Sequence, residues 1–272
     1  MRPSRPQPGA GLDGLGAVLA GTANVIMQLS RPAVGYGVVE SRVESGQVTR
    51  HPLKRFRTTF TYLAVALMGT DAERDAYRRA VDSVHAQVRS GPESPVRYNA
   101  FDPDLQLWVA ACLYRGAVDL QTRLHGPLDD AAAERFYREA ARLATTLQVR
   151  PEKWPADRAA FERYWEEALE SVSMDEPVRE YLRGIARLRF LPGPLGALAG
   201  PFHQFLTVGF LPARFRDEMG LGWDERSQRR FDRLMEAVAV ISRVSPGPLR
   251  EFPFNACLWD FRLRRALGRR LL

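Results

Sequence analysis

The sequence is poor in cysteine and in lysine. Its 272 residues include two cysteines, Cys112 and Cys257, too few for a disulfide framework or for a metal site built from thiolates. Lys54 and Lys153 are the only lysines, so arginine carries nearly all of the basic charge. Arginine keeps its charge at every relevant pH and pairs in a fork with carboxylates and phosphates.

The sequence also lacks a long hydrophobic run. Its most apolar stretch near the N-terminus, residues 15–29, is short for a transmembrane span and contains Asn24 and Gln28. We therefore expect no transmembrane span, a buried helix in this stretch, and a cytoplasmic protein. A weak peripheral contact with a membrane is the alternative that the composition leaves open.

The formal net charge of +7 and the isoelectric point near 9.8 raise the question of a nucleic-acid partner. Acidic and basic residues alternate along the chain, as in Glu134-Arg135 and Arg179-Glu180, which is typical of solvated helix faces. Only residues 262–270 concentrate arginine. A solvated tail, an acidic partner or a membrane surface would each explain that cluster, so no nucleic-acid partner is predicted.

Strand-like alternation is nearly absent, and the hydrophobic pattern is helical along most of the chain. Helix starts are marked by Asp71 as an expected N-cap, by Asp102 before Pro103, and by Asp129. Only residues 36–43 show a doubtful strand pattern. The predicted fold class is all-α. The predicted helices cover residues 71–89, 103–125, 130–147, 158–172, 177–190, 225–244 and 254–267.

The joints between these helices are short and contain proline or glycine, and no repeat period is present. We therefore expect one all-α domain over residues 15–268. A flexible N-terminus at residues 1–14 would precede it, and a basic tail at residues 269–272 would follow.

Residues 191–212 hardly contain a charge and combine glycine and proline with large apolar side chains such as Phe202 and Phe205. This composition suits either an internal packing bend or the wall of an apolar pocket. In the second case, Phe202 and Phe205 would contact a substrate.

The four histidines are candidate metal ligands or acid–base groups. His51 precedes a proline, His125 ends a predicted helix, and His203 lies in the apolar segment, so we expect structural or surface roles for these three. His85 shares an apolar helix face with Val81. A buried imidazole needs either a hydrogen bond or a metal as its partner, and the residues alone leave both possibilities open.

Zinc motifs, paired cysteines, a nucleophile elbow and a phosphate loop are all missing. If His85 binds a metal, it acts as a single protein ligand, which suffices for haem because the porphyrin supplies four ligands. The nearby segment from Lys54 to Phe60 contains arginines and hydroxyls that could bind haem propionates or another carboxylate. The alternative is an ordinary cationic surface that faces Glu40 or Glu44.

Four segments occur in an order that resembles one protein family. They are residues 32–38 (PAVGYGV), 55–59 (RFRTT), 84–89 (VHAQVR) and 98–109 (YNAFDPDLQLWV). Together they resemble the catalytic domain shared by latex-clearing (rubber) oxygenases and the MpaB-type oxygenases of fungal mycophenolic acid biosynthesis. The similarity covers residues 15–212, and the last of the four segments is its most specific part.

This resemblance implies a globin-like helical core around haem b. His85 matches the position of the family's proximal iron ligand. Arg55 and Thr59 match residues near the haem and its distal side. With Arg57, Arg55 would bind the propionates or polarise iron-bound oxygen.

The resemblance also implies a glutamate base in the region of Glu40. Rubber oxygenases carry a lysine able to cap the distal iron, and Thr58 takes that place here, so the sixth position would hold water or stay open. Arg31 stands where the family often has histidine. This departure and the missing lysine distinguish the chain from rubber oxygenases.

The leading hypothesis is a haem b-dependent oxygenase, or a related oxidoreductase, that uses O2 or peroxide on a small apolar or amphipathic molecule, with secondary metabolism as its setting. The candidate catalytic residues are Arg55, Thr58, Thr59 and Glu40, and the candidate haem-binding residues are His85, Arg55, Arg57 and Thr59. Two alternatives stay open: a haem carrier or sensor without turnover, and a haem-free helical module in which His85 is a core histidine.

Overall fold

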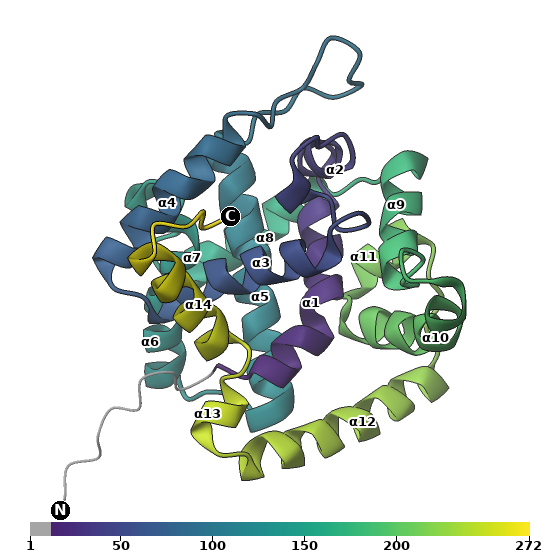
Figure 1. Cartoon of the computed structure of the whole chain (residues 1–272). Coiled ribbons are helices and arrows are strands. Elements are labelled where there is room, and N and C mark those ends of the chain that lie inside the picture. The colour runs from purple at the N-terminus through teal and green to yellow at the C-terminus, as the bar shows by residue number, and fades with distance from the viewer. Residues whose placement is uncertain (1–11) are drawn as a thin grey trace, which may run out of the picture.

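The computed structural model describes residues 12–272, and helices make up its framework (Figure 1). The all-α prediction is confirmed for this part of the chain. Residues 1–11, most of the segment predicted to be flexible, lie outside it. The α-helices are α1 (Gly14–Leu29), α2 (Pro32–Val39), α3 (Pro52–Met68), α4 (Asp71–His85), α5 (Pro103–His125), α6 (Asp130–Ala140), α7 (Arg142–Thr145), α8 (Arg158–Glu170), α9 (Glu176–Ala186), α10 (Gly193–Phe210), α11 (Ala213–Met219), α12 (Glu225–Val244), α13 (Gly247–Arg250) and α14 (Phe254–Ala266), with 3-10 turns η1 (Glu44–Gly46) and η2 (Pro151–Lys153).

Helices α1 and α5 lie at the centre and pack on each other, with α10 and α2 against α1 and with α12 and α7 against α5 (Figure 1). Trp108 of α5 is fully buried. Its ring stacks on Trp165 of α8 with centroids 5.2 Å apart, and its indole N–H donates to the Gln28 carbonyl at 3.0 Å. This indole therefore ties α1, α5 and α8 together through apolar contact and one satisfied polar group.

A second apolar cluster joins α3, α4 and α14. Phe60 of α3 lies 5.3 Å from Phe254 of α14, and Tyr77 of α4 lies 5.9 Å from Phe261 of α14, measured between ring centroids. The Tyr77 hydroxyl donates to the Thr58 carbonyl at 2.8 Å. Helix α3 thus has one face toward α14, which positions the opposite face toward the interior.

Helix α4 differs at both ends from the sequence prediction. Its N-cap is Thr70, not Asp71, because Thr70 and Glu73 form a reciprocal capping box. The helix ends at His85 rather than at Arg89. Beyond it the chain forms a hairpin-like loop in which Arg89 and Asn99 make an antiparallel bridge, and this loop projects from the helices in Figure 1.

Two other predictions need correction. Residues 36–43 contain no strand: Pro32–Val39 forms α2, whose buried residues Gly35, Tyr36 and Gly37 are consecutive instead of alternating. The helix predicted from Asp130 is interrupted after Ala140 and continues as the short α7. The predicted helices after Pro103 and from Glu225 to Val244 are confirmed, with caps at Asp102 and Asp224.

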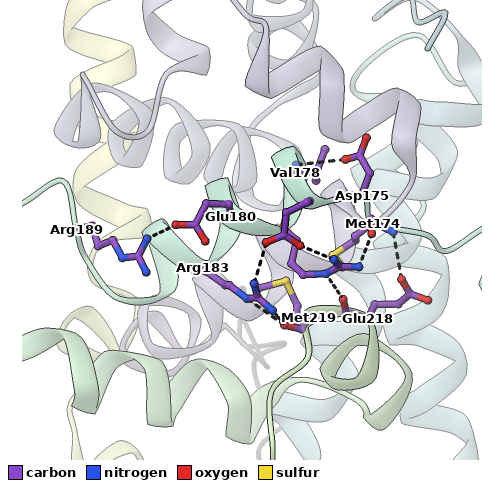
Figure 2. Close-up of polar contacts among 10 residues, drawn as sticks. Met174, Asp175, Val178, Glu180, Arg183, Arg189, Glu218 and Met219 are labelled. Carbon is purple, nitrogen blue, oxygen red and sulfur yellow. Dashed lines mark hydrogen bonds and ion pairs between the residues drawn. The ribbon is translucent and has the colours of Figure 1, made fainter. Parts of the chain in front are cut away.

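Arginines of α9 cap the end of α11 (Figure 2). The Arg183 guanidinium donates to the Met219 carbonyl at 3.0 and 3.2 Å. The Arg179 guanidinium donates to the Glu218 carbonyl at 2.7 Å. Both arginines also pair with Glu176. Because the last carbonyls of a helix have no partner within it, this arrangement explains part of the arginine content as helix capping.

Helices α10 and α12 approach closely at Gly209, where a Cβ atom would overlap the buried ring of Phe231. We predict that Gly209→Ala lowers the free energy of unfolding by about 1–3 kcal/mol through overpacking. The control is Gly21→Ala in α1, where a Cβ atom meets open space. This substitution should raise the free energy of unfolding by about 0.5–1 kcal/mol. Urea unfolding measures both, and equal effects of the two substitutions would contradict the proposed contact.

Helix α14 is tied to α4 by an ion pair. The Arg262 guanidinium donates to the two Glu73 carboxylate oxygens at 2.7 and 3.3 Å, and this contact lowers the pKa of Glu73 below its ordinary value. A depressed carboxyl pKa stabilises the fold above the unfolded-state value, near 4.5, and this contribution is lost as the pH falls through the folded-state pKa.

We therefore predict that Arg262→Gln lowers the free energy of unfolding at pH 7 by about 1 kcal/mol. The difference from wild type should shrink as the pH is lowered below 4.5, where Glu73 becomes protonated. Denaturant unfolding between pH 3 and pH 8 measures this. Arg265→Gln, the same change at an exposed position, should leave stability unchanged, and a loss that is independent of pH would rule out the ion pair as its cause.

Candidate functional site around His85

A cavity of about 260 Å³ lies between α2, α3, α4 and α5, with the loops at residues 41–46 and 98–100 at its margin. Its walls are mainly apolar, and arginine, histidine, threonine, tyrosine and amide side chains are set among them. Such a mixture is typical of a small-molecule or cofactor site. The main apolar lining residues are Val34, Val38, Val81, Val84, Val109 and Leu113.

His85 enters this cavity from the last turn of α4. Its ring lies edge-on to Phe101, with centroids 6.2 Å apart. Burial lowers the pKa of His85, against the opposing effects of Asp82 and Gln148, so the neutral imidazole is favoured. Its Nδ1 atom is buried and has no hydrogen-bond partner within residues 12–272. A buried polar atom without a partner is costly, and this one belongs to a metal-ligating side chain that lines the cavity, which makes it a ligand candidate.

Helix α3 supplies three of the predicted residues to the same cavity. Arg55, Thr58 and Thr59 line it because positions i, i+3 and i+4 share one face of a helix. Burial lowers the pKa of Arg55, although a guanidinium keeps its charge in proteins. The Thr58 hydroxyl donates to the Arg55 carbonyl at 3.1 Å. His85, Arg55, Thr58 and Thr59 are thus brought together around one space.

The two other predicted site residues lie outside the lining. Arg57 is on the opposite face of α3, where its guanidinium pairs with Asp260 at 3.5 Å and donates to the Leu271 carbonyl at 3.3 Å. Glu40, at the end of α2, is exposed and accepts a hydrogen bond at 2.8 Å from Tyr98, a lining residue. Burial and this carboxylate raise the pKa of Tyr98 to about 12. Glu40 therefore lies at the rim of the cavity.

A family model described as the catalytic domain of ER-bound oxygenase mpaB/B' and rubber oxygenase matches residues 10–240 of this chain. The chain belongs to this family. Two uncharacterized mycobacterial proteins, one from Mycobacterium bovis and one from Mycobacterium tuberculosis, are each 54% identical to it over 255 residues, which cover 94% of this chain and the full length of each relative. No solved structure matches the chain.

Membership of the mpaB/rubber oxygenase family supports an oxygenase-type oxidoreductase that acts on a small molecule. The residues on which the resemblance was based are partly the residues that line the cavity, since His85, Arg55, Thr59, Tyr98 and Asn99 are among them. Within residues 12–272, no helix is long and apolar enough to cross a bilayer.

The cavity also has lining residues that no sequence pattern indicated. Tyr62 and Tyr77 line it from α3 and α4, and Leu272 lines it from the segment after α14. Their positions depend on how α14 and the residues after it pack on α3, which is a long-range contact without a local motif. A tyrosine at helical spacing is a signal of burial only, so these residues could not have been assigned to the site.

Phe202 and Phe205 do not line the cavity, so the expectation that they form its wall is wrong. Phe205 packs 5.4 Å from Trp223 and 6.3 Å from Phe231, between ring centroids, while Phe202 is exposed. Residues 193–210 form α10, which continues through Pro201. Its last residues, from Leu206 to Phe210, are buried, so the packing alternative holds for that part of the apolar segment. Leu195, Leu198 and Phe202 in the first half of α10 are exposed, so burial does not account for the lack of charge there.

The three other histidines have the structural or surface roles that were expected. The His203 ring contacts the Ala186 carbonyl at 2.8 Å and the Thr22 hydroxyl at 3.2 Å, so both nitrogens have partners. His125 lies 3.9 Å from the Asp13 carboxylate. His51 is exposed at the start of α3. His85 is therefore the histidine that the cavity contains.

A buried amide network supports the wall beside His85. The Gln106 side chain of α5 donates to the Ala100 carbonyl at 2.6 Å and accepts from the Gln148 backbone N–H at 2.9 Å. The Gln148 side chain in turn donates to Asp82, one turn before His85. The network thus joins α4, α5 and the loop at residues 98–100.

We predict that Gln106→Leu lowers the free energy of unfolding by about 2–4 kcal/mol, because it leaves the Ala100 carbonyl and the Gln148 N–H buried without partners. The control is Gln87→Leu, an exposed glutamine after α4, which should change stability by less than about 0.5 kcal/mol. Thermal and urea unfolding measure both. A near-neutral Gln106→Leu would mean that these groups find other partners.

Proposed function

We propose that this member of the mpaB/rubber oxygenase family is a haem b-dependent oxidoreductase of the oxygenase type, with His85 as the proximal iron ligand. The helices around the cavity would form a globin-like core within a single domain over residues 15–268. The observation that carries the proposal is the buried ring nitrogen of His85, which has no hydrogen-bond partner among the described residues and belongs to a ring that lines an apolar cavity.

The residues around the cavity fit a haem. His85 is the one lining residue of the metal-binding types histidine, cysteine, aspartate and glutamate, and no group of three such residues that could hold a metal ion is found in residues 12–272. A porphyrin supplies the four ligands that the protein would then not need to provide. The valine-rich walls suit its apolar faces, and Arg55 can pair in a fork with a propionate.

Bound haem would supply the activation of O2 or peroxide. The protein's own residues have separate tasks in this proposal. The Arg55 guanidinium balances negative charge in a largely apolar space, and the hydroxyls of Thr58 and Thr59 offer hydrogen bonds to a bound oxygen-containing molecule. The apolar walls exclude water and orient the substrate.

At the rim, the Glu40 carboxylate would accept a proton from the substrate. The Tyr98 hydroxyl, which donates to Glu40, would hold that carboxylate in place. Arg57 supports the site from behind, because its pairing with Asp260 fixes α3 against α14; direct binding of a propionate by Arg57 would require that pair to open.

The cavity suits a small apolar or amphipathic substrate, because its walls are apolar while arginine, threonine and tyrosine provide a few polar contacts. We propose O2 or peroxide as the second substrate and secondary metabolism as the setting. Oxygen or peroxide consumption with apolar substrates would distinguish this enzyme from a haem carrier or sensor.

The haem proposal is tested by titrating purified protein with haemin and recording the Soret band. We expect one haem per chain in the wild type and at least a ten-fold loss of affinity in His85→Gly, because the iron loses its protein ligand. Added imidazole should restore the spectrum of His85→Gly, which loss of a merely structural histidine would not allow. His51→Gly, at an exposed position, is the matched control and should behave as the wild type.

Two outcomes would refute this proposal. A wild-type protein that takes up no haem would favour the haem-free helical module. Equal haem affinity and equal spectra in wild type and His85→Gly would show that another residue holds the iron.

A further inference from the structure

Helix α1 carries two amide side chains, Asn24 and Gln28, in a mainly apolar sequence. They lie four positions apart, so they share one face of the helix. The Gln28 Nε2 donates to the Asn24 Oδ1 at 2.6 Å, and the Asn24 Nδ2 donates to the Cys112 carbonyl of α5 at 2.7 Å. The two amides therefore form a chain of hydrogen bonds that begins at the backbone of α5.

This chain of hydrogen bonds has one direction. A backbone carbonyl only accepts, so Asn24 must turn its NH2 group to Cys112 and its oxygen to Gln28. Gln28 must then turn its own NH2 group to Asn24. The atom that remains on the Gln28 side chain is Oε1, which accepts hydrogen bonds and cannot donate them.

Helix α5 is fitted to the two amides. A Cβ atom at Gly116 would lie 2.3 Å from the Asn24 Nδ2, so this glycine leaves the space that the amide fills. The indole N–H of Trp108 donates to the Gln28 backbone carbonyl at 3.0 Å, which holds the backbone of Gln28 against α5. The two amides thus belong to the central pair of helices (Figure 1).

The side chain of Gln28 lines the cavity. Within the part of the chain that the structure describes, no hydrogen bond uses the Gln28 Oε1, and this oxygen is not among the enclosed atoms that lack a partner. It is therefore open to the cavity. The oxygens of the two other lining amides, Gln106 and Asn99, are occupied, since each accepts from a backbone N–H, at 2.9 and 3.0 Å.

We propose that the Gln28 Oε1 recognises a hydroxyl group of the substrate and makes the site specific for apolar molecules that carry such a donor. The apolar walls bind the body of the molecule, and Oε1 accepts from its O–H group. An ether oxygen in the same place would face Oε1 without a hydrogen atom between them, which is unfavourable in an apolar cavity. The inference rests on the proposed function in taking this cavity as the substrate site.

The acceptor and the charged donor of the cavity come from different helices. Arg55 of α3 offers only donors, whereas Gln28 of α1 offers an acceptor. A hydroxyl hydrogen that is donated to Gln28 therefore does not compete with the propionate or oxygen that the proposed function assigns to Arg55.

The experiment compares two fluorescent probes, β-naphthol, which donates a hydrogen bond, and its methyl ether, which cannot. Fluorescence titration of the full chain without haem gives both dissociation constants, so the result does not depend on haem binding. The quantity of interest is the selectivity, defined as the dissociation constant of the ether divided by that of β-naphthol. Comparing this selectivity between variants cancels the difference in hydrophobicity between the probes.

We expect Gln28→Met, which removes the acceptor and keeps a side chain of similar size, to lower the selectivity about ten-fold. Gln28→Glu keeps an oxygen at this position and should retain most of the selectivity.

Asn24→Ala tests the direction of the hydrogen bonds. Without Asn24, the Gln28 amide can turn its NH2 group to the ether oxygen, so the ether should bind more tightly and the selectivity should fall about three-fold. If Asn24 only supported the fold, its loss would weaken the binding of both probes alike.

The matched control is Gln121→Met in α5, because Gln121 is half-buried and does not line the cavity. Its selectivity should equal that of the wild type. Circular dichroism and urea unfolding check that each variant is folded.

Three results would overturn the inference. These are a selectivity that Gln28→Met leaves unchanged, an equal loss in Gln121→Met, and a wild-type chain that binds neither probe. The outcomes separate this inference from the proposed function. A chain that takes up no haem but whose selectivity depends on Gln28 would refute the haem proposal alone, and haem uptake with a selectivity independent of Gln28 would refute the hydroxyl site alone.

Discussion

The candidate site and the packing of α14 both depend on the two buried faces of α3. One face packs Phe60 against Phe254 of α14, and the other presents Arg55, Thr58 and Thr59 to the cavity. Because a helix rotates as a unit, the aromatic contacts on one side fix the direction of the polar side chains on the other. The hydrogen bond from Tyr77 to the Thr58 carbonyl extends this coupling to α4 and therefore to His85.

The sequence predicted those features that have local physical causes. The Asp102-Pro103 pair marks the start of α5 because it supplies a cap and a preset backbone angle, and the polar and apolar pattern of α12 gives its full length. The resemblance predicted that His85, Arg55, Thr58 and Thr59 belong to one site. Helical spacing explains why the last three share one face of α3.

Features that arise from distant contacts could not be predicted in this way. Residues 36–43 have an apolar pattern like that of a strand, but Pro32–Val39 forms α2, and its buried residues are the consecutive Gly35, Tyr36 and Gly37. Helix α4 stops at His85 because the following residues pair with those near Asn99, an interaction that helix propensity does not include. Packing between distant segments brings Leu272 to the cavity and keeps Phe205 away from it. No local sequence pattern indicates either position.

Three chain segments border the cavity: the loop at residues 41–46, the hairpin-like loop at residues 88–100 and the segment ending at Leu272. None of the three contributes a ring to the stacked aromatic core around Trp108. Side chains of these segments can therefore alter the shape and polarity of the opening without disturbing that aromatic core. The border of the cavity and the aromatic core thus belong to different parts of the chain, so one can change in sequence while the other keeps its packing.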